Sequence, residues 1–230
     1  MAVVSLASSP DISDFHCSDE IGKSDSSMNP TNPVLPPGYS AVPPGHVATV
    51  VTSLEMRARP PARSTHPFPA GLALEPLTRT VAAYRALYRA VGTDWLWFSR
   101  LVMADEKLQA ILDNPQVEFM ALRKDGRDAG ILELDFSQPG ECELSFFGVT
   151  ADMVGTGVGR TLMNEAIARA WARPIRRFWV HTCTLDHPAA LDFYRRSGFV
   201  PYAFQVEVFP DPRLTGILPR DCSRHVPLLG

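Results

Sequence analysis

The sequence contains no long hydrophobic run, no block of like charges and few cysteines. No stretch approaches the roughly 18 apolar residues that a membrane-spanning helix requires, which argues against a membrane protein. The formal net charge is -3, and like charges are not grouped, so charge gives no reason to expect a nucleic-acid or anionic-membrane partner. We therefore expect neither nucleic acid nor membrane among the partners.

The four cysteines are scattered along the chain. They form no CxxC pair and no spacing typical of metal ligands, so we predict no metal site and favour buried thiols over disulfides. Reduced thiols are typical of a reducing compartment. The N-terminus lacks both a basic region and a sustained apolar core, so it does not resemble a signal peptide. These features together predict a cytoplasmic protein.

Residues 1–45 differ in composition from the rest of the chain. They are rich in Ser, Pro, Gly and Asp and end in the run PTNPVLPPGYSAVPPG. This composition favours an extended, polyproline-like tail over a packed element. The β-branched segment 47–56 is the first that is typical of a strand. We therefore predict a disordered tail at residues 1–45 and one folded domain at residues 46–230.

Hydrophobic periodicity and turn residues predict the elements of that domain. We expect a helix with Thr78 as its N-cap and Gly92 as its end. Asp-Gly and Pro-Gly turns separate the next strands, which makes this part antiparallel. The expected strands are 117–123, 130–136, 142–149, 176–182 and 199–209, and the later helices are 106–112, 160–171 and 188–196. This order predicts an α/β fold with a mixed, mainly antiparallel central sheet flanked by helices.

A glycine-rich turn follows the third of these strands and reads Gly155-Thr156-Gly157-Val158-Gly159. Glycines allow the backbone to curl so that several amides point the same way, and these amides form an anion site with the helix N-terminus that follows. Arg160 is placed to add a charged contact to a phosphate. Glycines also serve plain tight turns, but a strand before the turn and an amphipathic helix after it favour the phosphate site.

Two common phosphate-binding loops do not fit this turn. The dinucleotide fingerprint G-x-G-x-x-G fails because Arg160 stands at its third glycine. The Walker A loop fails at both ends, since Val154 replaces its first glycine and Arg160 its lysine, although Thr161 fits. Nucleotide hydrolysis is therefore a distant alternative.

The turn is similar to the coenzyme A-binding motif of the GCN5-related N-acetyltransferase (GNAT) family, Q/R-x-x-G-x-G/A. Here the motif reads from Val154 to Gly159, with Val154 in place of Gln or Arg. A second segment, from His187 to Phe199, resembles the family's N-x-x-A-x-x-[LF]-Y-x-x-x-G-F, with His187 in place of Asn. The two motifs stand in the right order with a strand between them. The resemblance covers residues 117–202 well and implies the GNAT fold.

The resemblance also implies how a co-substrate, acetyl-CoA, would be held without a metal. In this family the strand before the loop splays from its neighbour, and its free backbone groups bind the pantetheine arm. Carried over, that role falls on Phe147, Gly148 and Val149. The pyrophosphate would be bound by the residues of the turn, which are Gly155, Thr156, Gly157, Val158, Gly159 and Arg160.

Two residues are the candidates for catalysis. Tyr194 stands where the family places a tyrosine that protonates the departing thiolate, although a packing role in the core is the plain alternative. Glu143 lies on the pre-loop strand, where family members often place a carboxylate base, and strict alternation would put it on one face with Phe147. A solvated polar face explains Glu143 equally well. Its competitors for the role of base are Glu133, Asp135 and His181.

The resemblance implies an N-acetyltransferase that moves an acetyl group from acetyl-CoA to a primary amine by direct attack. The acceptor is unknown and is either a small molecule or a protein lysine or N-terminus, and the protein is expected to be a monomer or a homodimer. The departures at Val154 and His187 keep a second hypothesis open, a non-catalytic acyl-CoA-binding regulatory or interaction module on the same fold.

Overall fold

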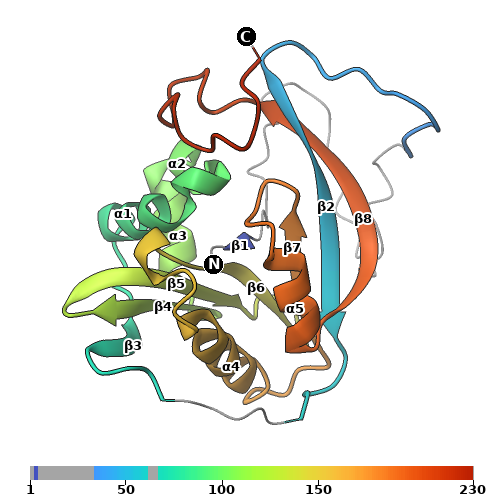
Figure 1. Ribbon diagram of the computed structural model, residues 1–230. Coiled ribbons are helices and arrows are strands. Elements are labelled where there is room, and N and C mark those ends of the chain that lie inside the picture. Colours follow the sequence, from blue (N-terminus) through green and yellow to red (C-terminus); the bar gives the residue numbers. More distant parts are fainter. Residues whose placement is uncertain (1–2, 5–33, 62–66, 230) are drawn as a thin grey trace.

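Eight strands form one sheet in the computed structural model, which describes residues 3–4, 34–61 and 67–229 (Figure 1). β1 (Val3–Val4) pairs with β6 and lies off the main path of the sheet. The other strands follow the order β3 (Leu72–Pro76), β4 (Val117–Lys124), β5 (Arg127–Asp135), β6 (Glu141–Val149), β7 (Arg177–Cys183), β2 (His46–Met56) and β8 (Val200–Pro210). All neighbours are antiparallel except β6 and β7, which are parallel. The predicted mixed, mainly antiparallel sheet is confirmed.

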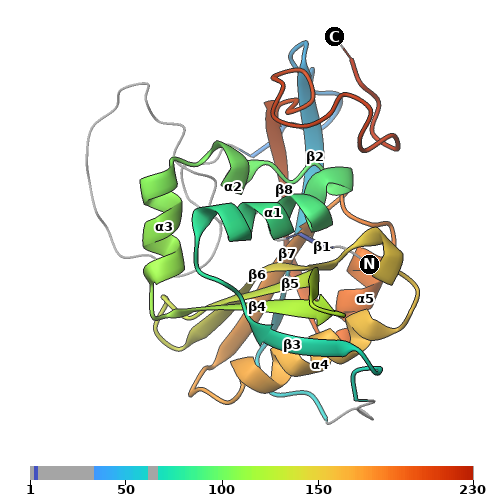
Figure 2. The same cartoon turned by 90° about the vertical axis from the view of Figure 1, so that its left-hand side faces the viewer.

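Helices cover both faces of this sheet (Figures 1 and 2). On one face, α1 (Val81–Gly92) and α3 (Asp105–Asp113) pack on β4 and β5, with the short turns η1 (Thr93–Trp95) and α2 (Ser99–Val102) between them. On the other face, α4 (Val158–Ala170) and α5 (Ala190–Ser197) pack on the central strands. The two faces each bury an apolar core, because alternate residues of every central strand point to opposite sides. We call these the α1 face and the α4 face.

The first long strand of the chain lies among the last ones in space. β2 is inserted between β7 and β8 and pairs antiparallel with both. Its upper part, with β8, is covered on the α1 face by the irregular C-terminal segment, residues 211–229 (Figure 1). Val47 and Phe209 are partners in the β2–β8 register and belong to the small core beneath this segment. The N-terminal strand and the C-terminal segment therefore build one wall together.

Several local predictions need correction. The N-cap of α1 is Thr80, whose Oγ1 accepts a hydrogen bond from the amide of Ala83 at 3.3 Å, whereas the sequence pattern favoured Thr78. β3 and α2 were not predicted, because both are short and have no periodic pattern of their own. The prediction that α1 ends at Gly92 is confirmed.

The described cysteines, Cys142, Cys183 and Cys222, are free thiols. The first and last are buried and Cys183 is half-buried, while Cys17 lies outside the described residues. Among the described helices, none has the length and apolar character needed to cross a membrane. Most of the predicted tail at residues 1–45 lies outside the described residues, so its disorder stays a prediction.

Candidate functional site

β6 and β7 run together at one end and part at the other. They pair only through three register positions, which join residues 141–143 to residues 177–179. Beyond Glu143 the edge of β6 turns away from β7, while β7 continues its pairing with β2. The strand before the glycine-rich turn is therefore splayed from its neighbour, and part of its backbone edge is left without that neighbour.

β1 lies at this opened edge. Val3 and Val4 pair antiparallel with Phe147 and Phe146 of β6 (Figure 1). The expected pantetheine-binding residues Phe147, Gly148 and Val149 are thus on the splayed stretch, and the first of them faces the chain's own β1. On its other edge the same stretch pairs with β5.

The glycine-rich turn folds into a compact loop that leads into α4. Gly155 and Gly157 have left-handed φ values of 80° and 84°, which favour glycine because a Cβ would be strained there. Thr156 Oγ1 donates to the carbonyl of Met153 at 2.7 Å and fixes the loop from inside. Gly157 is the N-cap residue of α4, so the first amides of this 13-residue helix open onto the loop.

A cavity of about 680 Å³ lies in front of this loop. It is lined on one side by the loop glycines and Arg160 and on the other by α5, which contributes Phe193 and Arg196. No described atom lies within 4 Å of where a Cβ would stand on Gly155, Gly157 or Gly159, so the space over the amides is open. All six predicted pyrophosphate-binding residues line this cavity or its 280 Å³ neighbour, the members being Gly155, Thr156, Gly157, Val158, Gly159 and Arg160.

Val158 differs from the other five residues in the direction of its side chain. Its side chain is buried in the core beneath α4 and is 2% exposed. Only its backbone amide is therefore available to an anion. Sequence reasoning also missed Arg196, which adds a second guanidinium to the cavity. The matched segment from His187 to Phe199 contained Arg196, but nothing in its spacing distinguished it from any exposed helix arginine.

Tyr194 is fully buried in α5 and packs against Phe193 and Phe199. Its Oη has no hydrogen-bond partner among the described residues. Burial, together with the nearby carboxylate of Asp186, raises the pKa of Tyr194 well above its ordinary value. The phenol is therefore neutral at physiological pH and has a proton to donate. A buried hydroxyl without a protein partner needs an explanation, and contact with a ligand or an ordered water is one.

Glu143 lies at the closed end of the splay, half-buried, opposite Asp135 of β5 and Trp179 of β7. The prediction that Glu143 shares a face with Phe147 is wrong. The β5–β6 register shifts between Glu133 and Leu134, so β6 carries one extra residue at Ser145. This bulge reverses the alternation, and Glu143 lies on the α1 face while Phe147 lies in the core of the α4 face.

The two other carboxylates considered for the role of base, Glu133 and Asp135, have different hydrogen-bond partners. Glu133 is buried, forms an ion pair with Arg100 at 2.8 Å and accepts a hydrogen bond from Tyr84 Oη at 2.6 Å. Burial raises its pKa against the opposing pull of Arg100. Such a closed network belongs to the core under α1 and leaves no oxygen facing the splay. Asp135 accepts a hydrogen bond from the amide of Ser137 at 2.7 Å and shapes the β5–β6 turn.

The connection from β7 to α5 is held by polar contacts. Asp186 accepts hydrogen bonds from the hydroxyl of Thr182 and from the amide of Cys183 at 2.9 Å. The sequence predicts a structural turn and a helix N-cap at Asp186. The turn after β7 is present, but the N-cap residue of α5 is Ala189. His187 Nδ1 accepts from the amide of Ala189 at 3.1 Å, and burial lowers the pKa of His187. His181 is buried on β7 and stacks on Trp179.

The aromatic cluster after α1 separates into different roles. Trp97 is buried against Tyr88 and Phe146 and belongs to the core. Trp95 lies between two imidazoles, with ring centroids 5.3 Å from His187 and 5.5 Å from His225. His225 comes from the C-terminal segment, and its Nε2 lies 3.1 Å from the carbonyl of Leu185. The C-terminal segment thus reaches the turn that leads into α5.

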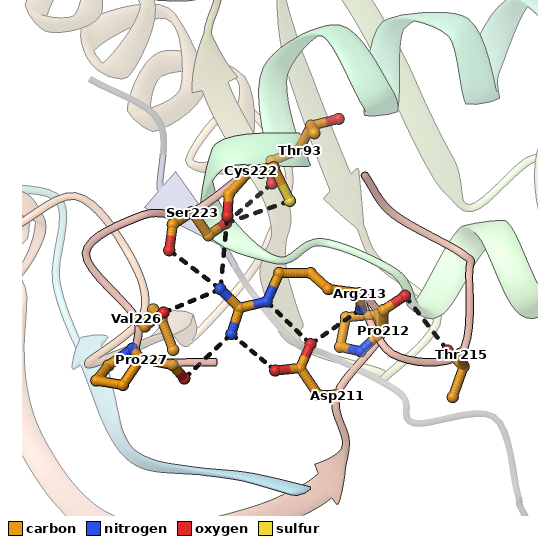
Figure 3. Close-up of polar contacts among 9 residues, drawn as sticks. All are labelled: Thr93, Asp211, Pro212, Arg213, Thr215, Cys222, Ser223, Val226 and Pro227. Atoms are coloured by element: carbon orange, nitrogen blue, oxygen red, sulfur yellow. Dashed lines mark hydrogen bonds and ion pairs between the residues drawn. The ribbon is translucent and has the colours of Figure 1, made fainter. Parts of the chain in front are cut away.

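One buried guanidinium holds the C-terminal segment in this place (Figure 3). Arg213 donates to both carboxylate oxygens of Asp211, at 3.0 and 2.7 Å, and both side chains are almost fully buried. It also donates to four backbone carbonyls, those of Cys222, Ser223, Val226 and Pro227. Ser223 Oγ donates to the carbonyl of Thr93 at 3.1 Å and ties the segment to η1.

No group of three or more His, Cys, Asp or Glu side chains within the described ranges is arranged to hold a metal ion. The site as described therefore consists of a splayed strand edge, an amide-lined loop with two arginines, and a buried neutral tyrosine.

Comparison with protein families gives one match: the model of the acetyltransferase (GNAT) family matches residues 84–199. This range contains β4 to α5 and both sequence motifs. A comparison with curated proteins finds no match.

Among solved structures, the chain is similar to a GCN5-related N-acetyltransferase from Kribbella flavida, with 18% identity and a TM-score of 0.48 over 75% of this chain and 63% of that one. A putative GNAT acetyltransferase from Novosphingobium aromaticivorans DSM 12444 has 20% identity and a TM-score of 0.49 over 75% and 69% of the two chains. A GCN5-related N-acetyltransferase from Sphaerobacter thermophilus has 18% identity and a TM-score of 0.48 over 73% and 52%. The chain thus spans less than two thirds of the first and third of these proteins.

Proposed function

The chain belongs to the acetyltransferase (GNAT) family, and on this premise we propose that it transfers an acetyl group from acetyl-CoA to a primary amine. The observation that carries the proposal is the combination of three features. These are the splayed edge of β6, the amide-lined loop with its cavity before α4, and the buried phenol of Tyr194 on α5, the helix whose Phe193 and Arg196 also line that cavity. Each suits a different part of an acyl-CoA thioester.

The pyrophosphate of the coenzyme fits the loop. Amides from Gly155 to Gly159 and the N-terminus of α4 attract an anion, and the open space over the glycines lets it approach the backbone. Arg160 and Arg196 face the same cavity from opposite sides. In this proposal Arg196 supplies the charged contact that Val154, standing where the family has Gln or Arg, does not provide.

The pantetheine arm is an amide-containing chain, which suits a strand edge that has lost its neighbour. The backbone of Phe147, Gly148 and Val149 is proposed to hydrogen-bond to it, as the family resemblance implies. Because β1 pairs with β6 at Phe146 and Phe147, this binding requires β1 to leave the edge. The unpartnered Oη of Tyr194 supports the fit, because a buried hydroxyl with no partner is a group prepared for a ligand atom.

When bound, acetyl-CoA supplies the thioester. The new bond forms between the amine nitrogen and the carbonyl carbon, and the carbon–sulfur bond breaks. A backbone amide of β6 stabilises the oxyanion that develops on the carbonyl oxygen. Tyr194 gives its proton to the leaving thiolate. Glu143 at the base of the splay is the proposed acceptor of the amine's proton, directly or through water.

Binding of acetyl-CoA measured by calorimetry tests the proposal. Gly157→Glu places a carboxylate over the loop and should abolish the binding, because it fills the space and repels the pyrophosphate. Gly126→Glu is the matched control: Gly126 has a φ of 80°, like Gly157, no atom within 4 Å of its Cβ position, and a place in the β4–β5 turn away from the cavity. Loss of binding in both variants, or in neither, would contradict the proposed site.

A second candidate is a non-catalytic acyl-CoA-binding module. The pairing of β1 with the edge of β6 favours it, because the chain itself occupies part of the pantetheine position. Deletion of residues 1–33 should then tighten acetyl-CoA binding without producing turnover on a broad panel of amines. Turnover by the full chain, reduced in Tyr194→Phe, would exclude this candidate.

A further inference from the structure

β8 ends the main path of the sheet and carries exposed apolar side chains along much of its length. Phe204, Val206 and Val208 are 68%, 46% and 46% exposed, and Val50 beside them on β2 is 42% exposed. The register pairs Val206 with Val50 and Phe204 with Thr52. These side chains therefore form one apolar stripe on the α4 face of the upper β2–β8 ribbon.

A bulge limits the stripe at its lower end. The β2–β8 register shifts between Ser53 and Leu54, so Tyr202 has no register partner on β2. Below the shift the alternation is reversed, and the guanidinium of Arg177 lies 4.9 Å from the ring centroid of Tyr202 on the α1 face. The stripe thus comprises Phe204, Val206, Val208 and Val50, and not the whole strand.

The outer edge of β8 has no strand beside it within the described residues. Natural sheets protect such edges with prolines, bulges or inward-pointing lysines. Here the bulge and Pro201 stand at one end and Pro210 at the other, while the stretch 203–209 between them contains no Lys, Arg or Pro. That stretch is an open hydrogen-bonding edge next to an apolar stripe, which is the usual description of an association surface rather than of a protected edge.

The sequence of this stretch is complementary to itself. In an antiparallel pair of two copies centred on Val206, Phe204 meets Val208 on the α4 face. On the α1 face Gln205 meets Glu207, so each carboxylate has an amide donor opposite it. A register centred on Glu207 would instead place the two Glu207 carboxylates opposite each other. The residue chemistry therefore favours the pairing centred on Val206.

We propose that this edge binds a second copy of the chain, through antiparallel β8–β8 pairing about a two-fold axis at Val206. An interface of this kind is isologous, since each surface element meets its own symmetry mate. The edge hydrogen bonds supply the pairing, the apolar stripes extend across the junction, and the Gln205–Glu207 contacts fix the register. The cavity of the proposed acetyltransferase site is lined by the glycine-rich loop and α5, not by β8, so it stays open in the dimer.

Sedimentation velocity of the full chain across micromolar concentrations tests the proposal. The wild type should sediment as a dimer that dissociates on dilution. Val206→Lys places two like charges opposite each other at the axis and should give a monomer. Val200→Lys is the matched control, since Val200 is 64% exposed on the same strand but lies beyond Pro201, outside the paired stretch. It should leave the dimer intact.

Two variants that introduce opposite charges at Gln205 test the register. Gln205→Lys would meet Glu207 in both copies and should raise the dimer association constant by roughly two- to thirtyfold, while Gln205→Glu should lower it by a similar factor. Circular dichroism melting of each variant confirms that the fold is kept. A monomeric wild type, a dimer that survives Val206→Lys, or equal effects of the two Gln205 variants would each overturn the proposal.

Discussion

The glycine-rich loop and the C-terminal segment are both irregular, yet they are held in opposite ways. The loop keeps its shape through its own residues: two glycines with positive φ, and hydrogen bonds from the hydroxyl and the amide of Thr156 to the carbonyl of Met153. The C-terminal segment keeps its shape through one side chain, because Arg213 binds Asp211 and four carbonyls spread over residues 222–227 (Figure 3). A local pattern reveals the first kind of structure, whereas the second exists only once distant residues have met.

The difference has a consequence for how each region responds to change. A loop fixed by local conformation tolerates changes elsewhere and fails when its glycines are replaced. A segment organised around one buried ion pair is sensitive to loss of either partner, because removing one leaves an uncompensated buried charge. We therefore expect stability effects to concentrate in the C-terminal segment and binding effects in the loop.

Replacement of Arg213 should have the strongest effect, because its side chain joins Asp211 to four carbonyls of the C-terminal segment. Arg213→Met leaves the buried Asp211 carboxylate without its partner and should lower the stability of the folded segment by about 3–5 kcal/mol. Hydrogen exchange should then show loss of protection across residues 211–229, with little change in the loop. Arg224→Met is the matched control, because Arg224 lies in the same segment with a side chain that is 84% exposed. If both variants keep the hydrogen-exchange protection of the segment, Arg213 does not hold the segment together.

The next effect concerns α5, where Tyr194 is buried next to Phe193, a residue that lines the cavity. Tyr194→Phe should lower kcat by about 100-fold or more, because it removes the proposed general acid. The free energy of unfolding should change little, since the Oη has no hydrogen-bond partner among the described residues. Steady-state kinetics and urea unfolding measure the two quantities. An unchanged kcat would show that Tyr194 serves packing alone. Tyr202→Phe, at a half-exposed tyrosine on β8, is the control.

A third test uses pH and acts on the C-terminal segment alone. Burial of Asp211 opposes ionisation, but the hydrogen bonds from Arg213 outweigh it and hold the pKa of Asp211 below its ordinary value. The ionised carboxylate therefore stabilises the segment. This contribution is complete above the unfolded pKa of about 3.9 and is lost as the pH falls through the folded pKa.

Hydrogen exchange of residues 211–229 should accordingly stay constant from pH 7 to about 5 and rise below about 4 relative to the intrinsic rate. The loop, whose shape rests on glycine conformation, should show no such change. A loss of protection already near pH 6 would show that a group other than Asp211 controls the segment.

A substitution at Val154, the first residue of the loop motif, should have a weaker effect than the others. Val154→Gln restores the side chain that the family motif has at this position and should tighten acetyl-CoA binding by roughly two- to tenfold, the worth of one net hydrogen bond. Val154→Leu, which keeps an apolar contact with the core, should leave the affinity unchanged. Equal affinities in all three proteins would show that Arg160 and Arg196 already provide what the motif residue supplies elsewhere.

Much of the fold was predictable from the sequence because its signals are local. The alternation of strands β4 to β6, their Asp-Gly and Pro-Gly turns, and the periodicity of α1 and α4 all lie within short windows. The errors share one physical origin. The N-cap of α1, the bulge at Ser145 and the role of Asp186 depend on which of several equivalent positions the packed structure selects.

The site divides in the same way. Both motifs were visible in the sequence, and the structure brings the loop, Arg160 and the α5 residues Phe193 and Arg196 to one cavity. Glu143 and Phe147 are four residues apart, so regular strand alternation predicts that they share a face. The bulge at Ser145 places them on opposite faces. Nothing in the chain order indicated that β1 would pair with β6 or that His225 would contact Trp95.

Most of the elements and the amide-lined loop follow from the sequence alone, because backbone preference and hydrophobic periodicity act between near neighbours, and two motifs in the sequence carry the family resemblance. Only the tertiary structure decided that β2 enters between β7 and β8, that Arg213 gathers the C-terminal segment, and that the edge of β8 is left open. These features join residues far apart in the chain. Their energy comes from burial and ion pairing that do not exist until the chain has folded.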